Sequence, residues 1–561
     1  MSAPSLVSWL DAPSVDTGVN FRLQEAGWER HTYAELAQLS HGAARTLTAA
    51  GVGHDDIVAL VLPSGPAFLA AFFGTLLAGA TPAPLAPPIA GAPATPGYDD
   101  RMTGLLTAAR PRAVVADAPL SGPLPRDVAL VPGAELLAPT GRGGGHTADP
   151  GRPETTAPPH PAVRGLVQFT SGSSGRARGV YLDSAALAAH VAAIRGWLDA
   201  SPGCVWASWL PVHHDMGLVG CLLGAVLGQD ELWLTRPEAF VRRPLEYLEC
   251  FGRHGASISA TPAFGLDHIL RKVRPEDLSG LDFSGWRSLV VGAERIPPGT
   301  LQGFHALLGP RGLSRRALLP AYGLAEAALA VTGLRHGQSW AEEKSVVGCG
   351  TPLPGITVRI VDDHGNELPD RGVGEIAVRS PYLAVDHLGD GAGGTRTENG
   401  ELRTGDAGFV ADGQLFVRGR IGDSLKLRGL RIFAEDVEQN LRRAGGLPPR
   451  AAVVLGEDVT GAVAAAVIED GAPATGGPQD ADVLRMLRHA VPGAEAVVRR
   501  VPRGALPRTP SGKPRRRMIW RAFVESSREV DGAHLGASSR EVDGAHLVES
   551  SRQVVAPHPE S

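Results

Sequence analysis

The stretch Leu166–Val180, LVQFTSGSSGRARGV, is the most informative part of this 561-residue chain. An apolar run ends at Thr170, and only Ser, Gly, Arg and Ala occupy the next eight positions. Glycine lets the backbone approach an anion closely with its amides pointing inward, and the serine hydroxyls add further donors. The pattern favours a phosphate-binding loop, with a flexible linker as the alternative. It is not a P-loop, because no Gly-Lys-Ser/Thr follows the glycines.

Composition narrows the class of protein. The formal net charge is −5, which provides no basic surface for nucleic acid. Four cysteines without CxxC spacing, and an N-terminus without a signal-like pattern, lead us to expect a cytoplasmic protein with reduced thiols. The uncharged segment 57–97 is interrupted by prolines, so it predicts a buried βαβ unit (strand 57–62, helix 67–78) and no membrane span.

Periodicity predicts an α/β chain in several parts. The expected elements are an amphipathic helix at 33–50, a strand at 113–116, an exposed loop or linker at 138–161, an α/β block at 166–337, a β-rich segment at 346–379 and a small α/β domain at 421–525. In that small domain we expect strands near 451–455 and 462–468 and a helix near 480–489.

The tail repeats the sequence SSREVDGAHL at 526–535 and again at 538–547, and a third copy begins at Ser550. Each repeat has few apolar residues, so it cannot bury enough surface to offset its ordering entropy. We therefore expect 526–561 to be disordered, with a short partner-binding motif as the alternative.

Five further stretches carry polar groups beside apolar segments. They are SWLPVHHDMGLVG (208–220), VVGAERI (290–296), AYGLAEA (321–327), LRTGDAGFVADGQLFVRGRIGDSLKLRGLR (402–431) and LPRTPSGKPRRR (506–517). Adjacent His213, His214 and Asp215 make a poor metal site, because consecutive side chains diverge. The Tyr322 ring can stack on a base, and Glu326 can hold a magnesium ion that bridges phosphates. Lys513, on a Pro/Gly loop, can neutralise charge at a reacting phosphate, although the basic run after it is also typical of a solvated face.

The motifs TSGSSG, HHDMGL, YGLAE, RTGD, GR-x-x-D and PSGK occur here in the order seen in the adenylate-forming superfamily of acyl-CoA synthetases, adenylation domains and luciferases. The resemblance covers about residues 20–523 and is closest to the fatty acyl-AMP ligases, on SWLPVHHDMGL, TPAFGLDHI and DFSGWRSLVVGAERI. It implies an α/β fold with a large N-terminal domain, 1–420, built from two α/β layered sheets plus a β-rich subdomain. A small, mobile α+β domain at 421–525 would carry the catalytic lysine.

The resemblance also implies residue roles. Lys513, His214 and Glu326 match catalytic positions, and Thr170 and Glu326 match positions that bind Mg²⁺. The positions that match ATP- or AMP-binding residues are Thr170, Ser171, Gly172, Ser173, Ser174, Gly175, Gly292, Ala293, Glu294, Tyr322, Gly323, Asp406, Arg420 and Arg431. Candidate walls of an acyl pocket are His214, Ser259, Thr261 and Phe264, and the hinge would lie at Gly422 and Asp423.

Three departures from the family pattern bear on function. Arg178 stands where the family loop usually has Lys, which keeps the charge, and Gly422 stands where many relatives have a charged hinge residue. The insertion that usually follows the YGLAE region in acyl-AMP ligases is missing or very short, because only 334–345 separate AVTG from VVGCG.

The expected reaction is ATP-dependent conversion of a carboxylic, most simply fatty, acid to acyl-AMP, followed by transfer to the phosphopantetheine thiol of an acyl carrier protein. An acyl-CoA ligase that uses free coenzyme A is the alternative, and a non-catalytic acyl or nucleotide sensor is a third. Retention of Lys513, Glu326 and Asp406 argues against the sensor.

Overall fold

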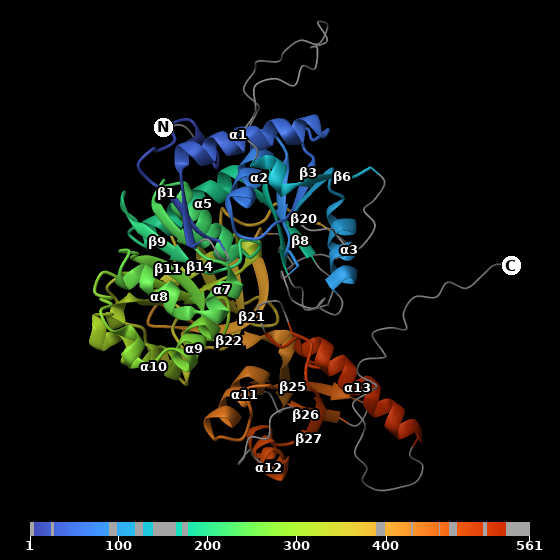
Figure 1. The fold of residues 1–561 in the computed structure, drawn as a ribbon. Helices are drawn as coiled ribbons and strands as arrows, with labels where there is room; N and C mark the ends of the chain where they lie inside the picture. The colour runs from blue at the N-terminus through green and yellow to red at the C-terminus, as the bar shows by residue number, and fades with distance from the viewer. Residues whose placement is uncertain are drawn as a thin grey trace, which may run out of the picture.

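The computed structural model describes residues 5–23, 27–88, 98–117, 127–137, 164–170, 178–388, 399–427, 430–458, 461–470, 480–508 and 513–533. These residues form a large unit and a small unit, and the sequence prediction places the boundary between them at 420/421. The two units have separate cores. Val417 is the last residue that packs on the large core, and Leu425 is the first in the core of the small unit. In Figure 1 the small unit, coloured orange to red, lies below the large one.

A nine-stranded sheet forms the centre of the large unit, with the order β17-β14-β13-β12-β11-β9-β10-β1-β2. Its strands are β1 (Gly18–Leu23), β2 (Gly27–Thr32), β9 (Val205–Ser208), β10 (Glu231–Leu234), β11 (Ile258–Pro262), β12 (Ser288–Gly292), β13 (Leu318–Gly323), β14 (Ala330–Gly333) and β17 (Thr351–Pro352). The stretch from β13 through β12, β11 and β9 to β10 is parallel, so the carboxyl ends of these strands share one edge. Ligands of open α/β sheets bind at such an edge.

Two further sheets complete the α/β part of the large unit. The four parallel strands β4 (Thr81–Pro84), β3 (Ile57–Val61), β5 (Ala113–Ala116) and β6 (Ala129–Pro132) form one of them. The second joins β20 (Asp386–Leu388), β8 (Arg178–Asp183) and β7 (Arg164–Thr170). Strands β7 and β8 are the antiparallel arms on either side of the Ser/Gly stretch.

Helices cover these sheets, as Figure 1 shows. They are α1 (Tyr33–Ala49), α2 (Pro66–Leu77), α3 (Tyr98–Ala109), α4 (Gly133–Leu136), α5 (Ser184–Trp197), α6 (Gly224–Val226), α7 (Pro237–Arg242), α8 (Pro244–Gly252), α9 (Ala263–Lys272) and α10 (Pro298–Leu308). Helix α1 begins with a capping box between Thr32 and Glu35, and Gly51 after its end has a φ of +85°. Only glycine adopts that conformation without strain, which explains why the helix stops there.

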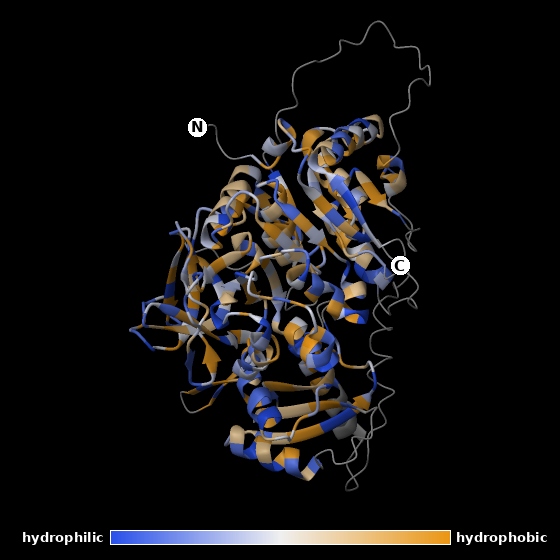
Figure 2. Cartoon of the chain, turned by 60° about the vertical axis from the view of Figure 1, so that its left-hand side comes forward, coloured by the Kyte–Doolittle hydropathy of each residue, from blue (hydrophilic) through white to orange (hydrophobic). Residues whose placement is uncertain are grey.

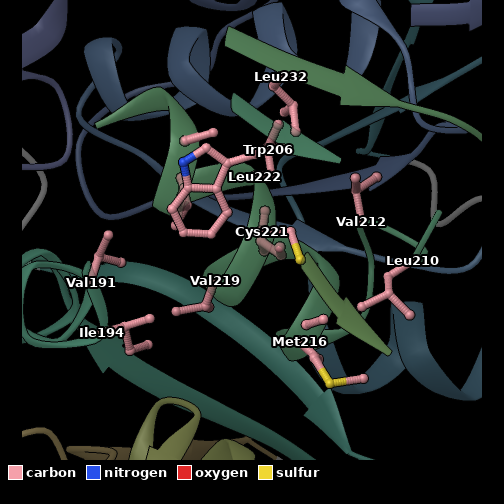
Figure 3. Close-up of a cluster of buried hydrophobic side chains, with 14 of the residues drawn as sticks. Val191, Ile194, Trp206, Leu210, Val212, Met216, Val219, Cys221, Leu222 and Leu232 are labelled. Carbon is pink, nitrogen blue, oxygen red and sulfur yellow. The ribbon is translucent and has the colours of Figure 1, made fainter. Parts of the chain in front are cut away.

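The segment Met216–Leu223 is a π-helix, which continues into α6. Its apolar side chains are buried against Trp206 of β9 and Val191 and Ile194 of α5, as Figure 3 shows. Gly224 allows this packing, because a Cβ there would lie 3.1 Å from the Trp206 ring. π-Helical segments are rare and occur frequently at functional sites, and this one directly follows the HHD motif.

The β-rich part of the large unit is the antiparallel sheet β18 (Thr357–Val361), β19 (Gly374–Arg379), β21 (Leu402–Ala411) and β22 (Gln414–Arg420), with the short hairpin β15 (Glu342–Glu343) and β16 (Val346–Val347). The small unit contains the hairpin β23 (Ser424–Leu427) and β24 (Leu430–Phe433), the sheet β25 (Ala451–Asp458), β26 (Gly461–Asp470) and β27 (Glu495–Pro502), and the helices α11 (Ala434–Arg443), α12 (Asp480–Ala490) and α13 (Arg516–Ala533). Orange apolar positions gather on the strands inside both units in Figure 2.

The structure confirms the α/β class and most local predictions. The βαβ unit is present as β3, α2 and β4, with β3 and β4 parallel, and β25, β26 and α12 lie where the sequence predicts them. No helix in the described parts of the chain combines the length and the apolarity needed to cross a bilayer.

The tail prediction needs one correction, because α13 continues through Ala533 and so includes the start of the first repeat. Once a helix has formed, each added residue gains a hydrogen bond without a new nucleation cost, which lets polar residues extend it. Residues 534–561, like the expected loop at 138–161, lie outside the described residues.

Candidate active site

A large cavity of about 4750 Å³ lies at the carboxyl edge of the nine-stranded sheet, between the two units. Its wall includes the ends of β12 and β13, the HHD segment, β21 and β22, and residues of the small unit from Glu435 to Met518. Pockets for single small ligands typically measure 300–1,000 Å³. This cavity is large enough for more than one substrate.

The turn after β12 contributes Gly292, Ala293 and Glu294 to the cavity wall. Ala293 has a φ of +63°, which costs an L-residue energy and persists only where the surroundings enforce it. Its carbonyl accepts a hydrogen bond from the Nζ of Lys513. The strained turn is therefore one contact point between the large unit and the lysine of the small unit.

Glu294 has a structural partner in addition to its place in the wall. Its carboxylate accepts a hydrogen bond of 2.7 Å from the backbone N–H of Phe264 at the start of α9. Helix α9 has no side-chain cap at Pro262, so Glu294 satisfies one of the donors that every helix N-terminus leaves free. Burial raises the pKa of Glu294, while the charge of Lys513 and this hydrogen bond lower it.

Tyr322, Asp406 and Arg420 form a hydrogen-bonded cluster in the wall. The Tyr322 hydroxyl donates to Oδ2 of Asp406 at 2.8 Å, and the Nε of Arg420 lies 3.0 Å from Oδ1. Burial and the Asp406 charge raise the pKa of Tyr322 well above 10, so the phenol remains a donor. Strands β21 and β22 position the pair, because Asp406 and Arg420 are direct cross-strand partners.

Gly323 has a steric reason to be glycine. Strand β13 has an irregular register at Tyr322/Gly323, and a Cβ at position 323 would lie 1.9 Å from the carbonyl oxygen of Leu329. The residue lines the cavity, but its identity is explained by this close approach of two backbone segments.

Glu326 lies in the short 3₁₀ turn Ala325–Ala327 and lines the cavity. Burial raises the pKa of its carboxyl, and the nearby Asp215 and Asp406 charges act in the same direction, against Arg420. Among the residues that the structure describes, no arginine or lysine forms an ion pair with it. A carboxylate in this setting suits a hard divalent cation such as Mg²⁺.

His213, His214 and Asp215 all line the cavity at the start of the π-helix. Nδ1 of His214 lies 2.6 Å from Oδ1 of Asp215, and this carboxylate raises the pKa of His214. His213 behaves differently, because burial lowers its pKa to about 4, with smaller contributions from the charges of His214 and Arg101. The neighbouring Asp215 therefore favours the protonated form of His214, whereas burial disfavours that of His213.

Lys513 reaches the cavity from the segment that precedes α13. Burial lowers its pKa, and the Arg420 charge adds to that effect. The carboxylates of Glu294, Asp215 and Asp406 oppose it. One ammonium group therefore interacts with acidic groups from three separate segments of the large unit: the turn after β12, the start of the π-helix, and strand β21.

The contacts between the units fix this arrangement. Asp436 of α11 lies 2.5 Å from NH1 of Arg295 and is also hydrogen-bonded to Arg418 of β22. In the 3₁₀ turn Ile421–Asp423, where the sequence predicts the hinge, a Cβ on Gly422 would lie 1.9 Å from the guanidinium of Arg517. Gly422 therefore leaves room for α13 to pack against the hinge in the present orientation.

The predicted acyl-pocket residues differ in their positions. Ser259 and Phe264 line the cavity, but the Ser259 hydroxyl donates to the Ala207 carbonyl at 2.7 Å and contacts the Tyr247 hydroxyl at 2.6 Å. Thr261 is 1% exposed and is not among the residues that line the cavity. Sequence reasoning missed Trp209 and Val241, which do line it. Trp209 stacks on Phe240 with ring centroids 4.0 Å apart.

Arg431 lies away from the cavity, 3.4 Å from both Asp363 and Ser424. It sits on β24, whose side chains alternate between two faces, and the sequence does not show which face meets the large unit. Thr170 is the last residue of β7, and Ser171, Gly172, Ser173, Ser174 and Gly175 lie outside the described residues. No cluster of three or more His, Cys, Asp or Glu side chains suited to a metal occurs in the described ranges.

Comparisons with known proteins show the family to which the chain belongs. Residues 11–385 match the family model described as AMP-binding enzyme. The chain is 31% identical over 565 residues to a Caulobacter vibrioides (strain NA1000 / CB15N) protein named "Putative acyl-CoA synthetase", covering 93% of this chain and 95% of that protein. It is also 31% identical over 402 residues to the medium-chain-fatty-acid–[acyl-carrier-protein] ligase JamA of Moorena producens (strain JHB), covering 64% and 68%.

Among solved structures, one from a study of fatty acyl-adenylate ligases from E. coli and L. pneumophila superimposes with a TM-score of 0.81 at 27% identity, covering 94% of this chain and 99% of that one. Fold, motif order and family match point the same way: the chain belongs to the AMP-binding enzyme family and is an adenylate-forming ligase of the fatty acyl-AMP ligase type.

Proposed function

We propose that this enzyme converts a fatty acid and ATP to acyl-AMP and pyrophosphate, and then transfers the acyl group to the phosphopantetheine thiol of an acyl carrier protein. The single observation that carries the proposal is the position of Lys513. It extends from the small unit into a cavity that also contains His214, Glu326 and Asp406. Support for the substrate and acceptor comes from the similarity to JamA and to fatty acyl-adenylate ligases.

In the first step a carboxylate oxygen of the acid bonds to the α-phosphorus of ATP, and the bond to the bridging oxygen of pyrophosphate breaks. Little covalent help is needed from the protein, so positioning and charge neutralisation dominate. His214, whose protonated form Asp215 favours, would attract the carboxylate of the acid, and Lys513 would stabilise the charge that develops at the α-phosphate.

The nucleotide and its metal fit the residues that are present. The Tyr322 ring would stack on the base, and Asp406 would accept hydrogen bonds from ribose hydroxyls, since a carboxylate has lone pairs beyond those used by Tyr322 and Arg420. Glu326, a cavity carboxylate that forms no ion pair within the described ranges, would hold Mg²⁺, which neutralises phosphate charge. Thr170 and the Ser171–Gly175 stretch would hold the phosphates.

In the second step the thiol loses its proton to solvent, its sulfur bonds to the acyl carbon, the bond from that carbon to the AMP oxygen breaks, and AMP leaves. Lys513 is not required at this stage. We propose that residues 421–525 act as a mobile domain that turns about Gly422 and Asp423, which lie in the short segment between the two cores.

Free coenzyme A is the second candidate acceptor, and one observation favours it. Between β14 and β17 the chain forms only the two-residue strands β15 and β16, so no extended insertion is present at the place where acyl-AMP ligases usually carry one.

The two acceptors can be separated in one experiment. The enzyme is incubated with ATP, a panel of fatty acids, and either holo-carrier protein or coenzyme A, with apo-carrier protein as the control. Thioesters are detected by mass spectrometry. We expect acyl-carrier protein and no acyl-CoA, whereas acyl-CoA alone would overturn the choice of acceptor and leave the adenylation step intact.

A further inference from the structure

Two arginines from different units line the same cavity, and nothing described so far uses them. Arg101 lies on α3 of the large unit, and Arg515 lies two residues after Lys513 in the small unit. Neither guanidinium forms an ion pair with a carboxylate in the part of the chain that the structure describes. The polar partner of Arg515 is the Met518 sulfur at 3.7 Å, and Arg101 lies 5.6 Å from the ring centroid of Tyr98.

The two guanidinium groups belong to the wall of one cavity. Burial lowers the pKa of Arg515, and the charge of Arg101 lowers it further. The same Arg101 charge also helps to keep His213 neutral. Like charges held together in a partly buried cavity without a protein anion are destabilising, and a bound anion would relieve that cost.

The geometry points to an anion site in which Arg101 and Arg515 together bind the pyrophosphate end of ATP, and the inorganic pyrophosphate that the first step releases. This assignment rests on the proposed adenylation activity. In this assignment, one arginine of the large unit and one of the small unit both contribute to binding of the leaving pyrophosphate.

The position of Arg515 relative to Lys513 supports this assignment. Pro514 between them is bridged to Arg508, as in an extended chain, and both Lys513 and Arg515 line the cavity. An extended chain advances about 3.3 Å per residue, which places the two side chains about 6.6 Å apart along it. With Lys513 at the α-phosphate, Arg515 would lie further along the triphosphate.

The position of Arg101 also fits a site at the pyrophosphate end of ATP. Phe169, next to the end of β7, packs on the apolar cluster that includes Met102 of α3, and α3 also contacts β8. Helix α3 therefore lies beside the two strands from which the Ser/Gly stretch departs.

Because Arg515 belongs to the small unit, the proposed site would exist only during the first of the two reaction steps. Arg515 belongs to the same segment as Lys513, so it lies opposite Arg101 only in the orientation that makes acyl-AMP. The thiol reacts after pyrophosphate has left, which favours pyrophosphate over a phosphate of the acceptor as the ligand. Bound pyrophosphate would hold the two units together, so its release would precede rotation of the small unit.

The test uses the full chain with Arg101→Gln, Arg515→Gln and Arg515→Lys, and with Arg488→Gln as the control. Arg488 is an exposed arginine at the end of α12 that does not line the cavity. Each protein is saturated with a non-hydrolysable acyl-AMP analogue, and inorganic pyrophosphate is titrated in by calorimetry. A charge-assisted contact of this kind is worth about 10- to 100-fold in affinity.

We expect the pyrophosphate Kd to rise about 10- to 100-fold in each glutamine variant, less in Arg515→Lys, and not in Arg488→Gln. Because both arginines would bind one anion, the double variant should lose less than the product of the single losses. An unchanged pyrophosphate Kd in both glutamine variants overturns the inference, as does an equal loss in Arg488→Gln.

Measuring the KM for the thiol acceptor distinguishes pyrophosphate from a phosphate of the acceptor as the ligand. Measuring acyl-AMP formation by the wild-type enzyme distinguishes failure of this inference from failure of the proposed function. The KM for the thiol acceptor should be unchanged in the glutamine variants, and a raised acceptor KM with normal pyrophosphate affinity would assign the site to the acceptor and overturn our assignment. If the wild-type enzyme forms no acyl-AMP, the proposed function fails. If it forms acyl-AMP and the variants bind pyrophosphate normally, only this inference fails.

Discussion

Replacing Lys513 by alanine should slow acyl-AMP formation far more than it weakens ATP binding. The ammonium group is the cation that the small unit brings to Asp215, Glu294 and Asp406. Without it, these carboxylates would repel the phosphate, and Arg420 would remain as a partial substitute. Loss of one pre-organised charge-stabilising donor costs on the order of 3 kcal/mol, which corresponds to a rate loss of about 10²- to 10³-fold.

The matched control for this prediction is Lys426→Ala. Lys426 is also a lysine of the small unit, but it is exposed and lies 3.3 Å from Asp363. Surface ion pairs contribute about 0–1 kcal/mol, so its loss should change the rate by less than about five-fold. The assay is single-turnover formation of acyl-AMP, with nucleotide affinity measured separately by calorimetry. An unchanged rate of ATP–pyrophosphate exchange in Lys513→Ala would refute the role of this residue.

Three further predictions follow from the same geometry. Asp436→Asn should weaken the contact with Arg295 and Arg418 and slow acyl-AMP formation about 10-fold, without slowing thioester formation from added acyl-AMP. Asp406→Asn should raise the KM for ATP about 10-fold, and an unchanged KM would remove it from the nucleotide site. Burial lowers the pKa of Lys513 below its usual 10.5, and the charged form of the side chain is the active one. As the pH rises, the rate of acyl-AMP formation should therefore begin to fall before pH 10.5 is reached. Lys513→Arg should retain activity to higher pH, and an alkaline limb that does not move in this variant would contradict the assignment.

Local signals in the sequence were sufficient for much of the fold. The capping box and Gly51 define α1, and the proline-interrupted apolar run defines β3, α2 and β4. The π-helix at Met216–Leu223 could not be predicted, because its apolar pattern also fits an ordinary helix or a strand. Its geometry depends on packing against Trp206, which is near only in the folded chain.

In the site, too, some residues could be predicted from the sequence and others could not. Ordered motifs led to Tyr322, Asp406, Arg420 and Lys513, which the structure brings into one cavity. Tertiary contacts alone decide that Arg431 pairs with Asp363. They also decide that Glu294 caps α9, that Trp209 lines the wall, and that Arg101 and Arg515 line the same cavity. Such contacts join residues far apart in the sequence, and a single sequence carries no pattern that records them.

Fatty-acid-dependent exchange of radiolabelled pyrophosphate into ATP, measured with the wild-type enzyme and no thiol acceptor, tests the central claim most directly. The account predicts exchange that requires both the acid and Mg²⁺, together with an acyl-AMP of the expected mass. An enzyme that binds ATP and fatty acid but catalyses no exchange with any acid from medium to long chain length would contradict it.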